Sequence, residues 1–292
     1  MCWYNSEART LLFVLENGEI RELKIPSNGK LFDNNNLHEY KAGQIDLFSA
    51  ADWNALAALM SRGYYYTGCE VRLQKNIQFR NGSISGFGST SYKFADTFSG
   101  NGFTVSAGKV SNTGDFAGLF GYVSGGAVIS NFTVSNVTVS GRNYCGIVGA
   151  ADGGSTISKV RITDCVIKGK DYVGAIGYAS TATVSNVFVT DRMGISGTTC
   201  VGGICGIAGA NVTIRKCYNG ADISGTTCVG GILGSSPDTV RKISEDTVIR
   251  CCYNAGSVTA SQSYGAGIAG NSYHTKMFRS ESYTKAKVAG RY

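Results

Sequence analysis

Carboxylate and amide side chains recur at matching positions along this chain, and pairs of carboxylates are the groups that cleave polysaccharides by acid–base catalysis. Asp164 and Asp191 stand at the same position of a repeated pattern, and Asn136 precedes them one repeat earlier. A second column of this kind comprises Asp115, Asn143 and Asp171. Carboxylates of neighbouring repeats could act together as general acid and base. Stacked Asn and Asp also satisfy the backbone groups of turns by themselves, so Asp164 and Asp191 are catalytic candidates only under an alternative function.

Histidine is scarce, which removes several classes of catalytic site. His38 and His274 are the only two, and neither belongs to the H-E-x-x-H pattern of zinc peptidases. The sequence also lacks G-x-S-x-G, a P-loop and any C-x-x-C pair, and it has no G-x-G-x-x-G in a βαβ context. It therefore predicts no metal, no cofactor and no enzymatic activity.

Four of the ten cysteines fall into two kinds of position. Cys217 and Cys252 share a repeat column with Phe and Val, which predicts small buried apolar side chains. Cys200 and Cys228 both lie in Gly-Thr-Thr-Cys-Val-Gly-Gly-Ile and are expected to stack one repeat apart. The Cα separation of such neighbours permits a disulfide, whereas their parallel Cβ directions disfavour it. The sequence leaves the redox state of this pair open.

The repeat that positions all these residues is a tetrad, Gly-aliphatic-apolar-Gly. Its six leading glycines are spaced 28, 28, 29, 28 and 36 residues apart, at Gly118, Gly146, Gly174, Gly203, Gly231 and Gly267. A period of this length is typical of one supersecondary unit repeated along a solenoid. The 40 Gly and 2 Pro, with abundant β-branched residues, favour short strands and tight turns. An all-β solenoid with rungs of about 28 residues is therefore predicted.

Two further elements are expected before the repeats. The runs Ala8–Leu15 and Glu19–Ile25 flank Asn17-Gly18, the strongest short hairpin signal. Residues 1–45 are thus predicted to form a hairpin appendage with a loop, and residues 46–292 the solenoid. A helix over 49–62, with Ser49 as N-cap and Gly63 as terminator, has the amphipathic spacing to cover the open end of the solenoid core.

A family resemblance adds to this prediction. The segment Phe94–Val105 resembles the F-x-G-x-F-D-G-N-G-x-x-I opening found upstream of GLUG-motif repeats, although Ala95 and Ser99 depart from it, and the tetrads look like the GLUG motif itself. The family occurs in bacterial surface adhesins and in non-catalytic N-terminal parts of IgA-peptidase-like proteins. The resemblance spans about residues 46–292. It implies a right-handed, single-stranded parallel β-helix in a secreted or cell-surface protein of a bacterium.

Charge and hydropathy limit the partners. The net charge is +7, but no dense run of Lys and Arg interleaved with aromatics appears, so nucleic-acid binding is not expected. The longest apolar run near the start, Leu11–Leu15, is too short for a signal peptide or a membrane span. Ala286–Tyr292 matches the stretch that elsewhere leads into the next tetrad, so the chain is expected either to be a fragment or to meet an end-to-end partner at the C-terminus.

One outward column is the candidate binding surface. The repeats align on an interior column of Phe132, Val160, Val187, Cys217 and Cys252. Because strand side chains alternate between faces, the residue after each should point outward, giving Thr133, Arg161, Phe188, Tyr218 and Tyr253, with Tyr283 as the expected next member. Such a stripe suits a glycan or a protein partner. Alternatively, the rings stack on one another or lie beneath the inserted loop Ser235–Asp246 and only stiffen the sheet.

These observations favour a non-catalytic binding, adhesion or presentation module of a bacterial surface or secreted protein. Two alternatives stay open. A polysaccharide lyase or hydrolase would use the β-helix to pair carboxylates, and a receptor-binding piece of a phage tail spike would be trimeric.

Overall fold

The computed structural model describes residues 2–5, 10–14, 20–24, 44–63, 68–236, 246–273 and 275–283. The N-terminal strands β1 (Cys2–Asn5), β2 (Thr10–Val14) and β3 (Ile20–Lys24) form an antiparallel sheet in that order. The β2–β3 pairing confirms the predicted hairpin, and β1 is an additional strand. The hairpin turn, the loop Ser27–Lys41 and the segment Ala286–Tyr292 lie outside the described residues.

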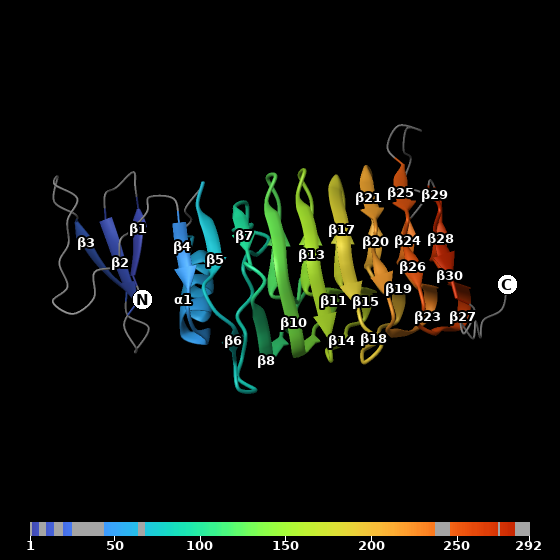
Figure 1. Cartoon of the computed structure of the whole chain (residues 1–292), viewed down its shortest axis with the longest axis horizontal. Coiled ribbons are helices and arrows are strands. Elements are labelled where there is room, and N and C mark those ends of the chain that lie inside the picture. Colours follow the sequence, from blue (N-terminus) through green and yellow to red (C-terminus); the bar gives the residue numbers. More distant parts are fainter. Residues whose placement is uncertain are drawn as a thin grey trace.

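The rest of the chain is the predicted parallel β-solenoid, whose rungs are stacked along the long axis of the molecule (Figure 1). Parallel strands from successive rungs pair edge to edge and form the walls. The first wall carries the tetrads and consists of β9 (Phe120–Val123), β12 (Val148–Ala151), β16 (Ile176–Ala179), β20 (Cys205–Ala208), β24 (Leu233–Ser236) and β28 (Ala269–Ser272).

The second wall carries the predicted stripe. Its strands are β4 (Gln44–Leu47), β5 (Glu70–Leu73), β7 (Thr97–Ser99), the first half of β10 (Val128–Ser140), β13 (Thr156–Thr163), β17 (Ala182–Val189), β21 (Val212–Arg215), β22 (Tyr218–Asn219), β25 (Thr247–Arg250), β26 (Tyr253–Asn254), β29 (Thr275–Phe278) and β30 (Glu281–Ser282).

The remaining strands complete each turn. They are β6 (Ile77–Gln78), β8 (Thr104–Ser111), β11 (Asn143–Cys145), β14 (Val166–Lys168), β15 (Asp171–Val173), β18 (Gly194–Ser196), β19 (Thr199–Gly202), β23 (Asp222–Gly230) and β27 (Val258–Ala266). No helix in the described part of the chain combines the length and the apolar character that crossing a membrane requires.

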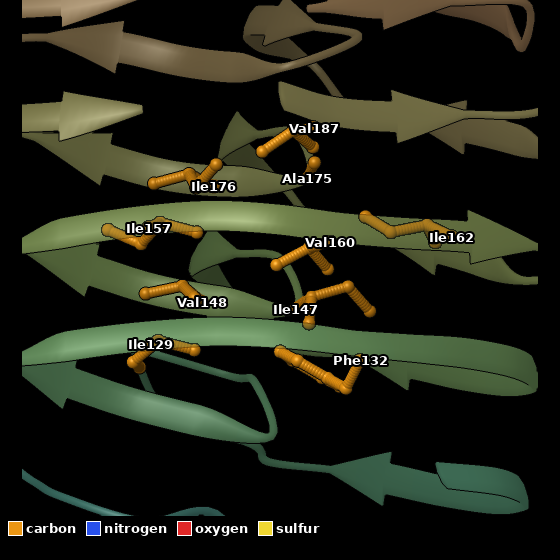
Figure 2. Close-up of a pocket in the computed structure, with 10 residues that line it drawn as sticks. All are labelled: Ile129, Phe132, Ile147, Val148, Ile157, Val160, Ile162, Ala175, Ile176 and Val187. Carbon is orange, nitrogen blue, oxygen red and sulfur yellow. The ribbon is translucent and has the colours of Figure 1, made fainter. Parts of the chain in front are cut away.

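The interior follows the predicted register. Ile129 pairs with Ile157, and Phe132 with Val160, in neighbouring rungs. Every member of the predicted interior column is at most 3% exposed, Cys217 and Cys252 included. Figure 2 shows side chains from opposite walls, all aliphatic except Phe132, meeting in the interior. The void between them has a volume of about 10 Å³. That volume is at the lower limit for one water molecule, so this part of the interior is a packed core.

The tetrad glycines are required by the close approach of successive rungs. A Cβ on Gly146 would lie 2.7 Å from the carbonyl oxygen of Gly174 in the next rung, and a Cβ on Gly149 would lie 2.5 Å from that of Gly121 in the preceding rung. Real Cβ atoms essentially never come so close to backbone. The leading and the closing glycine of each tetrad thus face opposite neighbours, which explains why both positions of the repeat hold glycine.

The predicted helix is present as α1 (Ala50–Ser61), and it closes one end of the core. The Ser49 side chain accepts a hydrogen bond from the Asp52 backbone amide, and Gly63 follows with φ of +81°. Trp53 is fully buried and stacks on Phe87 at 4.3 Å between ring centroids. The helix differs from the prediction in one respect: β4 precedes it and already pairs with β5, so α1 lies within the first turn rather than before it.

Candidate binding surface

The predicted stripe forms on the second wall in the predicted register for five rungs. Thr133 pairs with Arg161, Arg161 with Phe188, Phe188 with Tyr218, and Tyr218 with Tyr253. We call Phe188, Tyr218 and Tyr253 the aromatic stripe. It lies on β17, β22 and β26, which pair with one another in successive rungs.

The rings of the aromatic stripe stack on one another. The centroids of Phe188 and Tyr218 are 4.4 Å apart with 11° between their planes, and those of Tyr218 and Tyr253 are 5.9 Å apart with 16°. The guanidinium carbon of Arg161 lies 4.9 Å from the centroid of Phe188 and covers its other face. This is the arrangement that the alternative interpretation predicted, in which the rings stiffen the sheet.

The stripe is nevertheless accessible. Phe188 is 38% exposed, and Tyr218 and Tyr253 are half-buried. Residues 237–245 of the inserted loop lie outside the described residues. Both faces of Phe188 and of Tyr218 touch a neighbour, and one face of Tyr253 does, so the stripe presents mainly ring edges and the polar ends of the two tyrosines. Such a surface can donate and accept hydrogen bonds, but it offers no free ring face inside the stack.

Tyr283, the expected sixth member of the stripe column, does not lie in that column. Tyr253 pairs with Glu281 and Asn254 with Ser282, so Tyr283 lies two residues beyond the column. Its side chain is 59% exposed. The expectation relied on matching Ser282-Tyr283 to Cys252-Tyr253 by residue type, whereas the rung length of 28 residues places Glu281 opposite Tyr253.

A second ladder of rings was not predicted. Phe116, Tyr144 and Tyr172 occupy successive rungs, each two residues before a leading tetrad glycine and each with φ between +56° and +63°. Neighbouring centroids are 4.7 Å apart in both pairs, with planes inclined by 6° and 21°. The recurrence of an aromatic residue every 28 positions was the available signal.

A polar group borders this second ladder. The Tyr122 hydroxyl donates to Asp152 at 2.8 Å, and Lys93 lies 3.6 Å from the same carboxylate and 4.4 Å from the centroid of the Tyr122 ring. Burial, and then the hydrogen bond to Asp152, raise the pKa of Tyr122. The phenol therefore stays neutral and remains a donor. The hydrogen bond to Asp152 and the contact with Lys93 together hold the Tyr122 ring in place.

The catalytic candidates lie in exposed positions at a corner of the solenoid. Asp164 follows the end of β13, and its carboxylate accepts a hydrogen bond from the Thr163 hydroxyl at 2.9 Å. Asp191 lies just beyond the end of β17. In the described part of the chain no hydrogen bond links the two side chains. In the second predicted column Asn143 does pair with Asp171, and Asp115 forms an ion pair with Arg142 at 3.0 Å.

Cys200 and Cys228 stack one rung apart as predicted, since their neighbours Thr199 and Thr227 pair, as do Val201 and Val229. Both are free thiols, and both have φ of +54°. A hydrogen bond from the Cys200 thiol lowers the pKa of Cys228 to about 7, while the same bond and burial raise the pKa of Cys200. Within the described ranges no cluster of three or more His, Cys, Asp and Glu could hold a metal ion.

Comparison with known proteins identifies a likeness in fold. No family model matches the chain, and no curated protein matches it. The crystal structure of a "putative immunoglobulin A1 protease" from Bacteroides ovatus matches with a TM-score of 0.64 at 20% sequence identity. The match covers 84% of this chain and 77% of that one. At this level of identity the likeness shows that the two chains share the solenoid fold.

Proposed function

We propose that this chain is a non-catalytic binding module of a secreted or cell-surface bacterial protein, which acts in adhesion or in presenting a partner. The observation that carries the proposal is the aromatic stripe, three successive rings held rigidly on an outer wall and open to solvent. Rigid, partly polar ring edges bind a partner with little loss of conformational freedom. The resemblance to GLUG-motif repeats and the fold shared with the Bacteroides ovatus protein support the same class of protein.

Binding is favoured over cleavage by the placement of the carboxylates. Glycosidases hold two carboxyl groups on either side of the scissile bond, and catalytic acids usually lie in a cleft that perturbs them. Asp164 and Asp191 instead lie exposed at a corner. Asp171 pairs in register with Asn143, not with a second carboxylate, and Asp115 is neutralised by Arg142.

The test combines binding and turnover on the same protein. We expect retention on a glycan array or on immunoglobulin A1, the substrate class named for the structural neighbour, with no new reducing ends and no cleavage of the immunoglobulin. Turnover that disappears in Asp164→Asn or Asp191→Asn would instead establish the enzyme alternative. Cleavage of immunoglobulin A1 would likewise contradict a non-catalytic module.

Substitution of the stripe locates the site. Tyr218→Ala with Tyr253→Ala removes both hydroxyl-bearing rings and should weaken binding at least about tenfold, as loss of interface tyrosines commonly does. The matched control is Tyr264→Ala with Tyr273→Ala, which removes two exposed tyrosines outside the stripe. Circular dichroism of both variants would verify the fold. Equal affinity of the stripe variant and the native protein would reject the stripe as the binding site.

A further inference from the structure

Exposed cations lie along one side of the aromatic stripe on the second wall, although they are scattered in the sequence. Two columns run beside the stripe on this side. One contains Ser130, Ser158, Ser185, Arg215 and Arg250, which pair rung to rung; of these, Ser185 is buried. The residues that directly follow them have positive φ and form the other column, comprising Asn131, Lys159, Asn186, Lys216, Cys251 and, one rung further, Arg279.

Together these columns make a cationic surface. We call Lys159, Arg161, Arg215, Lys216, Arg250 and Arg279 the basic face; all six are exposed. In the described residues none of them takes part in an ion pair. The facing carboxylate in the stripe column is Glu281, while the nearby Lys276 is already paired with Asp246 at 2.7 Å. The exposed Asp164 and Asp191 border the face beyond the ends of β13 and β17.

The basic face is long. It extends over five rungs, from β13 to β30, of which all but the β17 rung carry at least one of its cations. At about 4.8 Å per rung it spans about 19 Å along the solenoid axis. Rows of like charge raise the local concentration of counter-ions and attract polyanions. A linear anionic polymer lying parallel to the axis would meet a cation on most rungs, whereas a compact anion would meet only one or two.

The stacking of the stripe rings favours an acidic polysaccharide over single-stranded nucleic acid as the bound polyanion. Single-stranded nucleic acid is held by bases that stack on free aromatic faces. In the stripe both faces of Phe188 and of Tyr218 are taken, by Arg161 and by neighbouring rings. The second face of Tyr253 lies on the side of Glu281, a carboxylate that disfavours a phosphate backbone. The surface still offers cations, the two tyrosine hydroxyls and the partly exposed Ser130 and Ser158 of the adjacent column, which match the carboxylates or sulfates and the hydroxyls of a sugar polymer.

We propose that the basic face and the aromatic stripe together bind a linear acidic polysaccharide, aligned with the solenoid axis. This inference rests on the proposed binding function and specifies its ligand. The cations hold the repeated anionic groups, and the edges of Tyr218 and Tyr253 contact the sugar rings between them.

The columns themselves supply substitutions that preserve the fold. Arg215→Ser and Arg250→Ser install the residue that three other rungs carry at this position, and Lys159→Asn and Lys216→Asn install an asparagine, which tolerates positive φ. The matched control is Lys109→Thr with Lys168→Ser. It removes two exposed cations from another wall, and the new residues match their paired neighbours Thr138 and Ser140.

The probes are polygalacturonate for carboxylates, dextran sulfate for sulfates, dextran for an uncharged polymer and oligo(dT) for nucleic acid. We expect the full chain to bind one or both acidic polysaccharides, more weakly as salt is added, and not to bind dextran. Arg215→Ser with Arg250→Ser should weaken binding severalfold, and the four-residue variant by about tenfold or more, because each exposed charge pair contributes modestly. The control variant should bind like the native protein.

Several outcomes would overturn the inference. Equal loss in the control variant would show attraction by net charge and no site. Tighter binding of oligo(dT) than of either acidic polysaccharide would assign the face to nucleic acid. If a neutral glycan or a protein binds and the charge variants bind it unchanged, the proposed function survives while the acidic ligand is rejected; if no glycan or protein binds at all, both fail.

Discussion

At the scale of single residues, the surroundings of the free cysteines in this solenoid shift their thiol pKa values in opposite directions. Burial raises the pKa of the Cys165 thiol to about 11 and that of Cys145 to about 12. Cys228 is the opposite case, because the neighbouring Cys200 donates a hydrogen bond to it and lowers its pKa to about 7. Reactivity follows the thiolate, so stacking of two thiols one rung apart creates one reactive position.

This contrast predicts the order of alkylation. The thiolate fraction of Cys228 rises as pH increases through about 7, so its labelling by iodoacetamide should reach half its maximal rate near that pH. Cys200→Ala removes the donor and should shift the midpoint upward. Peptide mapping by mass spectrometry separates Cys228 from the exposed Cys251. The same midpoint with and without Cys200 would show that the pair does not tune this thiol.

Another residue-scale feature is a pair of buried asparagines in a column that is apolar in the preceding rungs and continues to Ser282. Asn219 and Asn254 pair in register and are fully buried, and Val189 precedes them in the same column. The Asn219 amide donates to the Asn254 side chain at 2.8 Å, and each amide also donates to a backbone carbonyl two residues on. The buried polar groups are thus satisfied, and the ladder fixes the turn after β22 and β26.

At the scale of elements, the sequence period correctly predicted the rungs and their register. Matching by residue type alone, without the period, gave a wrong assignment. The tetrads predicted the rungs, and the aliphatic column from Ile129 predicted the register because both repeat on every turn. Tyr283 was misplaced because residue type was matched in preference to the interval. The ladder of Phe116, Tyr144 and Tyr172 was missed because all three residues have positive φ and two of them lie in strands of only three residues, β11 and β15, which are too short to show an alternating pattern.

The capping helix allows an element-scale prediction. Trp53 contacts Phe87, Phe98 and Phe120, and its indole nitrogen donates to the Ser85 carbonyl at 2.9 Å. Trp53→Ala should lower the free energy of unfolding by about 3–5 kcal/mol, since it removes a large buried ring and leaves a cavity. Urea unfolding followed by circular dichroism measures the change.

The control for this variant is Phe48→Ala. Phe48 adjoins the same helix, but its side chain is 44% exposed, so its loss should change the free energy of unfolding by about 0.5 kcal/mol or less. Similar losses in the two variants would mean that α1 does not act as the cover of the core.

At the scale of the whole molecule, the basic face is a property that only the stacked chain has. Lys159, Lys216 and Arg279 are separated by 57 and 63 residues in the sequence, so no short window of the chain brings these cations together. The solenoid places them in one column because they stand at equivalent positions of different rungs. The sequence could predict the column positions from the period. It did not predict the face, because cations alternate with Asn and Cys along the column.

Stacking also predicts how the molecule unfolds. Each rung contacts its two neighbours, so stability is approximately a sum of rung and interface contributions, and a local defect should act locally.

Ile249 of β25 is fully buried between Ile214 and Met277. Ile249→Ala should cost about 2–5 kcal/mol and should accelerate amide hydrogen exchange in β21, β25 and β29, with little change in β10 and β13. Ile129→Ala, the equivalent residue of β10, should give the converse pattern around β7, β10 and β13. Equal acceleration along the whole chain in either variant would show that the rungs open as one cooperative unit, because only then would a defect in one rung be shared by all.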